Sequence, residues 1–266
     1  MSALTVDNLH KSRDGQEPLA AITAYDYTFA RLADEAGVDI LLVGDTVGMV
    51  VQGESTTLPV TLDQMVYHTR CVTRGRSRAL VVADLPFRAY KSSPAQALDS
   101  ATRLMAEGGC EMVKLEGGAP MVETVAFLQD RDIPVMGHLG LTPQSVHQFG
   151  GFRVQGREPE RAAALVEEAM DMEQAGARAL LLEAVPRDVA RRVTESVSIP
   201  VIGIGAGRDC DGQVLVLHDA LGLFEGFQPR FAKQYLDGAA TVREAIGSFC
   251  QEVRSGAFPT KEHSFE

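Results

Sequence analysis

The fold is decided by the segment GVDILLVGD, residues 37–45, in which a helix-ending glycine is followed by a short apolar strand and an acid. The same unit returns as GCEMVKLE at 109–116 and as GARALLLE at 176–183. Continuous apolar runs of this length are typical of strands that are covered on both faces. The carboxyl ends of such strands meet at the rim where α/β proteins place their chemistry. The three repeats therefore predict three acids at one rim.

Eight strands of this kind are predicted, and helical patterns separate most of them. They span Leu19–Ala24, Val38–Val43, Ala79–Ala83, Glu111–Leu115, Ile133–Gly137, Arg178–Leu182, Pro200–Ile204 and Gln213–Leu217. This alternation favours a closed (β/α)8 TIM barrel over a doubly wound open sheet. The chain has 266 residues, and such a barrel typically needs roughly 250, so residues 1–266 are expected to form one domain. Between Gly205 and Gln213 there is no room for a full helix.

The sequence also indicates where two helices begin and which two segments are irregular. Thr61 with Gln64, and Ser93 with Gln96, fit the capping-box pattern at a helix start. The glycine-rich segment 140–159 is predicted to be either a lid or a structural excursion. The tail, about 255–266, has no periodicity and is predicted either to be disordered or to dock on a neighbouring subunit.

Composition limits the function classes. The chain has 36 acids and 25 bases, a formal charge of −11, and it lacks a basic cluster, which argues against nucleic-acid binding. Cys71, Cys110, Cys210 and Cys250 lie too far apart in sequence for a disulfide framework or a zinc ladder. The polar residues 1–18 lack the apolar core of a signal peptide, and no apolar run approaches a membrane span. We expect a soluble cytoplasmic protein with free thiols.

Polar residues gather at the predicted carboxyl ends of the strands. They are Asp45, Thr46, Asp84, Lys114, Glu116, His138 and Glu183. Carboxylates crowded into a partly dry pocket repel one another, so they hold protons, pair with cations or bind a metal. Oxygen ligands with one histidine and no cysteine suit Mg²⁺ better than Zn²⁺. The pattern therefore predicts a magnesium site at this rim.

Each of these residues also has a purely structural interpretation. Asp45 and Asp84 could cap helices. Glu183 could pair with an arginine, His138 could orient a loop, and Lys114 could pair with Glu116. Their convergence on one rim favours a functional site.

Two further rim segments leave alternatives open. Gly203–Gly207 follows the seventh strand, where many barrels bind phosphate, although tight packing of the loop is an equal alternative. His218 and Asp219 follow the eighth strand and belong either to the site or to the scaffold.

Several distinctive strings cover nearly the whole chain. They include VGDTVGM at 43–49, TLPVT at 57–61, ADLPF at 83–87, MVKLEGG at 112–118, GHLGLTPQS at 137–145, VQGR at 154–157 and IPVIGIGAG at 199–207. In these strings the chain resembles the ketopantoate hydroxymethyltransferase (3-methyl-2-oxobutanoate hydroxymethyltransferase) family. The resemblance implies a barrel enzyme of pantothenate biosynthesis. It would use Mg²⁺ to move a hydroxymethyl group from 5,10-methylenetetrahydrofolate to 2-oxoisovalerate, giving ketopantoate, and would assemble as a homodecamer.

The resemblance also implies roles for most of the rim residues. Asp45, Asp84 and Glu116 would form the metal site, Asp45, Thr46, Asp84 and Lys114 would contact the oxoacid, and Glu183 would accept the proton. His138, named from its place on the rim and not from the resemblance, is a further candidate that would support the site from outside. The family usually has serine where this chain has Thr46, and the added methyl restricts the hydroxyl's rotamers.

Three alternative functions remain open for this chain. One is another magnesium-dependent oxoacid enzyme of the isocitrate lyase or phosphonomutase type. The second is a Schiff-base aldolase that uses Lys114. The third is a catalytically silent scaffold protein.

Overall fold

The computed structural model describes residues 3–13, 17–223 and 228–266 and shows a closed barrel of eight parallel strands in chain order. The strands are β1 Leu19–Thr23, β2 Ile40–Val43, β3 Leu80–Asp84, β4 Met112–Glu116, β5 Val135–Gly140, β6 Ala179–Glu183, β7 Val201–Ile204 and β8 Gly212–Leu215. β1 pairs with both β2 and β8, which closes the barrel. The predicted single (β/α)8 barrel is confirmed, with strand bounds that differ from the prediction by at most three residues.

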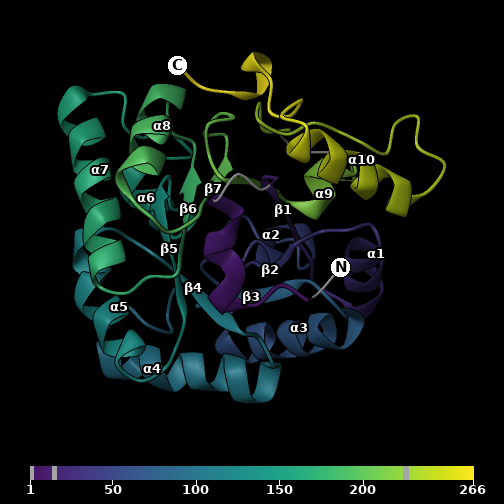
Figure 1. Ribbon diagram of the computed structural model, residues 1–266. Coiled ribbons are helices and arrows are strands. Elements are labelled where there is room, and N and C mark those ends of the chain that lie inside the picture. The colour runs from purple at the N-terminus through teal and green to yellow at the C-terminus, as the bar shows by residue number, and fades with distance from the viewer. Residues whose placement is uncertain (1–2, 14–16, 224–227) are drawn as a thin grey trace.

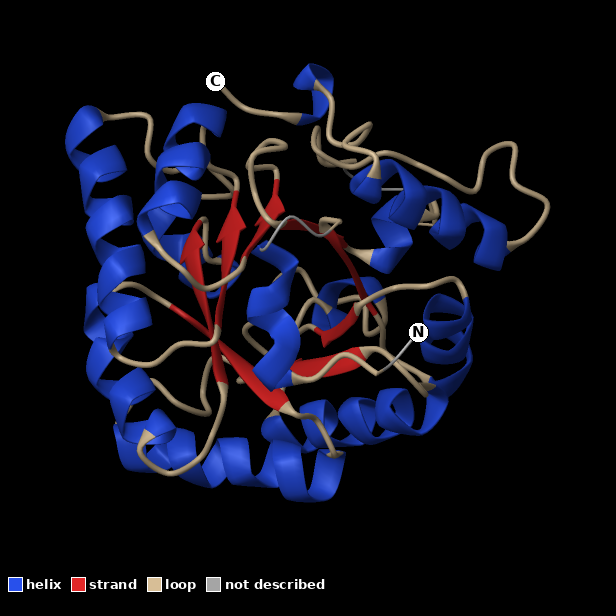
Figure 2. Ribbon diagram, viewed as in Figure 1, coloured by secondary structure: helices blue, strands red, loops and turns tan. Residues whose placement is uncertain are grey.

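Helices surround the strands as an outer ring (Figures 1 and 2). They are α1 Tyr27–Glu35, α2 Val47–Val50, α3 Leu62–Gly75, α4 Pro94–Arg103, the π-helix η2 Leu104–Gly108, α5 Val122–Gln129, α6 Val146–Phe149, α7 Pro159–Gln174, α8 Arg187–Ser196, α9 Leu217–Ala220 and α10 Val242–Arg254. Short 3-10 turns are η1 Val6–Arg13, η3 Ala119–Met121, η4 Pro143–Ser145 and η5 Lys261–His263. No helix separates β7 from β8 in this fully described stretch, as the short spacing predicts.

The two predicted capping boxes have different outcomes. At α3 the box is complete: Gln64 N donates to Thr61 Oγ1 and Thr61 N donates to Gln64 Oε1. At α4, Ser93 caps the helix, but Gln96 Oε1 accepts from Ser92 instead of closing the box. The predicted hydrogen bond from the Ser93 amide back to the Gln96 side chain was therefore wrong, because the Ser92 amide and hydroxyl both donate to that glutamine oxygen.

The side-chain alternation of the strands sets the position of the polar rim. Inward-facing residues form a separate apolar cluster that includes Leu42, Val82, Met112, Met136, Leu181 and Ile204. Since successive side chains point to opposite faces, residues two positions further along face inward as well. Val82 is thus followed by Asp84, Met136 by His138 and Leu181 by Glu183. The barrel interior changes from apolar to charged at its carboxyl end.

The amino-terminal segment covers the other mouth of the barrel. Leu9 on η1 is 1% exposed and joins the interior apolar cluster. Its neighbours there include Leu19, Ile40 and Leu80, which are the first residues of β1, β2 and β3. Figure 1 shows η1, in purple, lying across the barrel. A ligand therefore reaches the interior from the carboxyl end of the strands.

The carboxyl-terminal tail packs on its own barrel. Phe258 is buried, and Phe265 forms a bridge with Pro186 in which Arg187 N donates to the Phe265 carbonyl at 2.9 Å. The ring of Phe265 also contacts Phe231 edge to face. The prediction of disorder for this tail was wrong, because apolar side chains anchor it. Docking on a neighbouring subunit stays a prediction.

The cysteines and the helices agree with the compositional analysis. All four cysteines are free, and three of them are buried. Among the described residues, no helix combines the length and the apolar character needed to cross a bilayer.

Candidate active site

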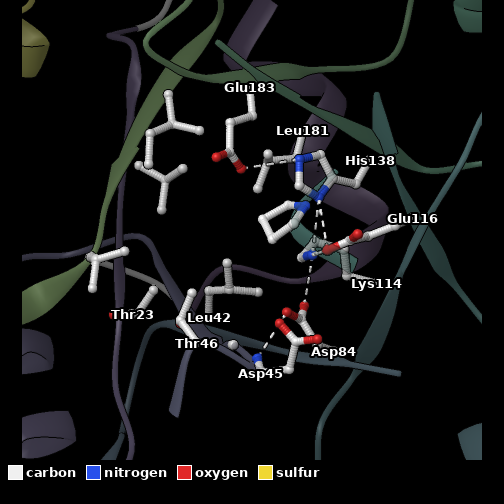
Figure 3. Close-up of a pocket in the computed structure, with 15 residues that line it drawn as sticks. Thr23, Leu42, Asp45, Thr46, Asp84, Lys114, Glu116, His138, Leu181 and Glu183 are labelled. Atoms are coloured by element: carbon white, nitrogen blue, oxygen red, sulfur yellow. Dashed lines mark hydrogen bonds and ion pairs between the residues drawn. The ribbon is translucent and has the colours of Figure 1, made fainter. Parts of the chain in front are cut away.

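The seven predicted rim residues line one small cavity of about 50 Å³ at the carboxyl end of the barrel (Figure 3). They are Asp45, Thr46, Asp84, Lys114, Glu116, His138 and Glu183. Each of the four acids comes from a different strand or strand end. A space of this size accommodates a few waters or a small acid, not a large ligand.

Lys114 is the central cation of the cavity. Its Nζ lies 3.0 Å from Asp84 Oδ1, 3.2 Å from His138 Nδ1 and 3.9 Å from Glu116 Oε1. Burial alone would lower the pKa of Lys114, but the negative charges of Asp84, Glu116 and Asp45 outweigh it and raise the pKa. The amine is therefore a protonated point charge, not a free nucleophile. This geometry argues against a Schiff-base aldolase.

Asp45 and Asp84 form a buried pair that has too little positive charge around it. Asp45 N donates to Asp84 Oδ2 at 3.0 Å, so the two groups are held together by the backbone. Burial raises the pKa of Asp45 well above its usual range, and the charges of Asp84 and Glu116 raise it further. Burial also raises the pKa of Asp84, although Lys114 opposes this. Asp84 Oδ1 has the Lys114 ammonium as its ion-pair partner, and this one cation faces the three buried carboxylates of Asp45, Asp84 and Glu116.

These properties fit a hard cation. The donor atoms are carboxylate oxygens, and the acids that line this buried cavity outnumber its one lysine. Within the described residues, no group of three or more His, Cys, Asp or Glu side chains is already arranged as a metal cage. Mg²⁺ characteristically takes one or two carboxylates and completes its coordination with water and substrate oxygens. The arrangement therefore suits Mg²⁺ better than a metal ion that takes all its ligands from the protein.

Gln144 and Tyr90 connect the acids, and the sequence analysis did not identify them as site residues. Gln144 N donates to Glu116 Oε2 at 2.9 Å, and Gln144 Nε2 donates to Asp45 Oδ2 at 2.9 Å. The Tyr90 hydroxyl donates to Gln144 Oε1 at 2.6 Å. All these side chains are buried. The string GHLGLTPQS contained the signal, because it places a glutamine in η4, the turn that follows β5.

His138 connects the cluster to Glu183. Since the Lys114 ammonium can only donate, His138 Nδ1 accepts from it, which leaves Nε2 facing Glu183 Oε2 at 3.3 Å. The Nε2 contact lies outside hydrogen-bond geometry. The Glu183 side chain is 15% exposed, against 4% for Asp84 and 1% for Glu116. Of these three acids, Glu183 is therefore the most accessible to an entering ligand.

Thr46 is held beside the acids by a tyrosine. Its Oγ1 lies 2.7 Å from the Tyr25 hydroxyl. Gly44 makes this approach possible, because a Cβ at that position would lie 2.8 Å from Thr46 Oγ1. The threonine thus places its hydroxyl in the cavity.

The glycine loop after β7 is closely packed. A Cβ at Gly205 would lie 2.8 Å from the ring of Phe231, and one at Gly207 would lie 2.7 Å from Arg187 Cγ. Both residues have positive φ, a conformation that glycine adopts readily. Of the two predicted interpretations, the geometry supports tight packing.

Comparison with known proteins identifies the family of this chain. Residues 3–261 match the family model described as ketopantoate hydroxymethyltransferase. The chain belongs to the ketopantoate hydroxymethyltransferase family. It is 55% identical over 261 residues to 3-methyl-2-oxobutanoate hydroxymethyltransferase of Magnetococcus marinus, covering 98% of this chain and 97% of the relative. The enzyme of the same name from Shewanella loihica is 52% identical over 265 residues, covering 100% of both chains. The expected family, and with it a one-carbon transferase, is confirmed.

Solved structures share the barrel at low identity. A 2,3-dimethylmalate lyase, described as a member of the PEP mutase/isocitrate lyase superfamily, aligns with a TM-score of 0.58 and 18% identity, covering 83% of this chain and 81% of its own. The phosphoenolpyruvate phosphomutase of Streptomyces platensis aligns with a TM-score of 0.62 and 16% identity, covering 96% and 90%. Likeness at this level shows a common fold for the ketopantoate hydroxymethyltransferase family and these enzymes.

Proposed function

We propose that this chain transfers a hydroxymethyl group from 5,10-methylenetetrahydrofolate to 2-oxoisovalerate, with water consumed and ketopantoate and tetrahydrofolate formed. In this proposal Asp45, Asp84 and Glu116 hold Mg²⁺, and Glu183 is the base. Family membership supports the reaction class. The observation that carries the residue roles is the buried cluster of acids around one ammonium, with the more accessible Glu183 beside it.

The oxoacid would enter the small cavity with its carboxylate toward Lys114. The protonated amine supplies a point charge that neutralises this carboxylate and reduces its repulsion from the acids. Thr46, held by Tyr25, would donate its hydroxyl to a substrate oxygen. Asp45 and Asp84 would hold Mg²⁺, with Glu116 completing the site. When bound, the ion stabilises the negative charge that develops on the keto oxygen.

Glu183 would then remove the proton from the branched carbon beside the ketone. That hydrogen is too weakly acidic for a carboxylate to remove in water, so charge stabilisation and a fixed position are both required. Glu183 lies on the inward face of β6, and His138 Nε2 lies 3.3 Å from its Oε2. His138 therefore acts as a positioning residue in this proposal.

Glu183→Gln tests the assignment of the base. The variant should bind Mg²⁺ and 2-oxoisovalerate with affinities close to those of the unmodified enzyme, measured by titration calorimetry. Its exchange of the substrate hydrogen for deuterium, followed by NMR without folate, should fall at least about a hundredfold, since a lost general base typically costs 10²–10⁴. Glu167→Gln, an exposed position on α7, is the matched control. Undiminished exchange in Glu183→Gln would refute the assignment.

We propose, from the family resemblance alone, that the protein is a cytoplasmic homodecamer. Light scattering on the purified protein tests the assembly, with about ten times the 28.6 kDa chain mass expected.

A further inference from the structure

A second and larger cavity adjoins the catalytic one. It has a volume of about 310 Å³, within the range of sites for drug-sized ligands. The two cavities share Thr46, Pro143, Glu183, Ile204 and Val216 as lining residues. A ligand in the larger space would therefore reach the residues that we assign to the oxoacid and the base.

The walls of the second cavity are mainly apolar. Met49, Val50, Leu141, Phe152 and Phe231 contribute side chains from four separate segments of the chain. Phe152 is 52% exposed, so part of the wall faces solvent. Apolar walls with few polar groups suit a flat, largely apolar ring system that is oriented by a small number of hydrogen bonds.

Asp219, on α9, is the acid that belongs to this cavity and not to the catalytic one. It is partly buried, and burial raises the pKa of its carboxyl to about 6. In the part of the chain that the structure describes, no hydrogen-bond donor contacts the Asp219 carboxylate. Two titratable residues are its neighbours. Burial raises the pKa of Tyr25, and the charge of Asp219 raises it further. His218 is adjacent to Asp219 in the chain. A ligand that donates hydrogen bonds would stabilise this partly buried carboxylate, to which the described protein groups donate none.

We propose that this cavity binds the reduced pterin ring of the one-carbon donor, with both Asp219 oxygens accepting hydrogen bonds from the ring. The inference rests on the proposed function and adds the donor's binding site to it. A 2-amino-4-oxo pteridine presents a ring N–H and an exocyclic amino group side by side, and this pair matches the two oxygens of a carboxylate. The apolar walls would contact the faces of the ring, and the shared lining would place the transferable carbon beside the oxoacid.

Other occupants fit the observations less well. A purely aliphatic ligand would leave Asp219 without donors. A second oxoacid molecule would place its carboxylate near Asp219 and Glu183, where like charges repel. The pterin satisfies both the apolar walls and the acid.

Ligand binding to Asp219→Asn tests the proposal. Titration calorimetry would compare tetrahydrofolate with an analogue in which methyl replaces the 2-amino group, using the intact enzyme and the variant. The intact enzyme should bind tetrahydrofolate at least tenfold more tightly than the analogue, and Asp219→Asn should lose most of this discrimination. Asp171→Asn, at an exposed site on α7, is the matched control and should discriminate like the intact enzyme.

The result that would overturn the pterin site is tetrahydrofolate binding to Asp219→Asn as tightly as to the intact enzyme. The pterin site would also be overturned if Asp219→Asn still bound tetrahydrofolate more tightly than the analogue by the same factor as the intact enzyme. Thermal unfolding of the near-isosteric variant would establish that it is folded.

A second readout separates this proposal from the proposed function. Deuterium exchange into the oxoacid needs no folate, whereas transfer does, so Asp219→Asn should raise the ratio of exchange to transfer at least tenfold when the donor is below its KM. An unchanged ratio would count against the pterin site. Absence of exchange in the intact enzyme would refute the proposed function, and the calorimetry would still decide the pterin site.

Discussion

Replacing Gln144 by leucine would remove the hydrogen bonds that join the acids of two strands. The Gln144 side chain donates to Asp45 Oδ2 and to the Leu85 carbonyl, at 2.9 and 3.0 Å, and accepts from Tyr90 at 2.6 Å. Leucine fills a similar volume but removes the donor that Asp45 Oδ2 and the Leu85 carbonyl share, whereas the Tyr90 hydroxyl keeps its hydrogen bonds with the Glu116 backbone. Each buried group left unpaired costs about 1–3 kcal/mol. Asp45 can relieve part of this cost by binding a proton. We therefore expect Gln144→Leu to lower the free energy of unfolding by about 2–4 kcal/mol.

The assay for Gln144→Leu is thermal and urea unfolding without ligands, with Gln174→Leu at an exposed site on α7 as the control. For a chain of this size, Tm should fall by roughly 10 °C, since 1 kcal/mol corresponds to about 2–4 °C. The control should change stability by no more than about 0.5 kcal/mol. Affinity for Mg²⁺ should fall as well, because Asp45 loses the group that orients it. A loss below about 1 kcal/mol with unchanged Mg²⁺ binding would refute the reasoning.

Three further predictions follow from particular residues. Thr46→Ser keeps the hydroxyl and should retain kcat/KM within about threefold, whereas Thr46→Val should lose at least tenfold, consistent with the loss of one substrate hydrogen bond; equal activity of the two variants would contradict a substrate contact. The pKa of Asp219 rises from 3.8 to about 6 on folding, so the stability that this group contributes falls as pH rises through that window. In urea unfolding without folate, the stability of Asp219→Asn relative to the intact protein should therefore increase by about 1–2 kcal/mol between pH 4 and 7; a constant difference would contradict the shift. Burial raises the thiol pKa of Cys110, Cys210 and Cys250 to about 12. A thiol reagent should therefore modify only the fourth cysteine, Cys71, rapidly in the folded protein and all four in denaturant; more than one rapidly modified thiol before unfolding would contradict the burial.

The fold was predictable because local signals and tertiary requirements agree. Each strand is a short apolar run with clear boundaries, and the repeated glycine-strand-acid unit places Asp45, Glu116 and Glu183 at strand ends. The alternation of side chains then directs Asp84 and His138 into the same interior. Sequence alone was sufficient for these positions, since strand period and strand direction determine them.

Other features depend on contacts that periodicity does not encode. Gln144 reaches the acids through a turn after β5, and its partner Asp45 is 99 positions away in the chain. The tail is anchored by Phe258 and Phe265, which act as isolated apolar residues in an irregular segment. The role of Asp219 remained open between site and scaffold, because only the assembled walls reveal a cavity beside it.

The central claim is that clustered carboxylates hold a divalent ion which makes the oxoacid acidic enough for Glu183. The most direct measurement is the rate of deuterium exchange into 2-oxoisovalerate, without folate, as Mg²⁺ is varied. The exchange rate should rise and saturate with Mg²⁺, vanish in excess chelator and return when Mg²⁺ is restored. An exchange rate that is the same in chelator and in saturating Mg²⁺ would contradict it.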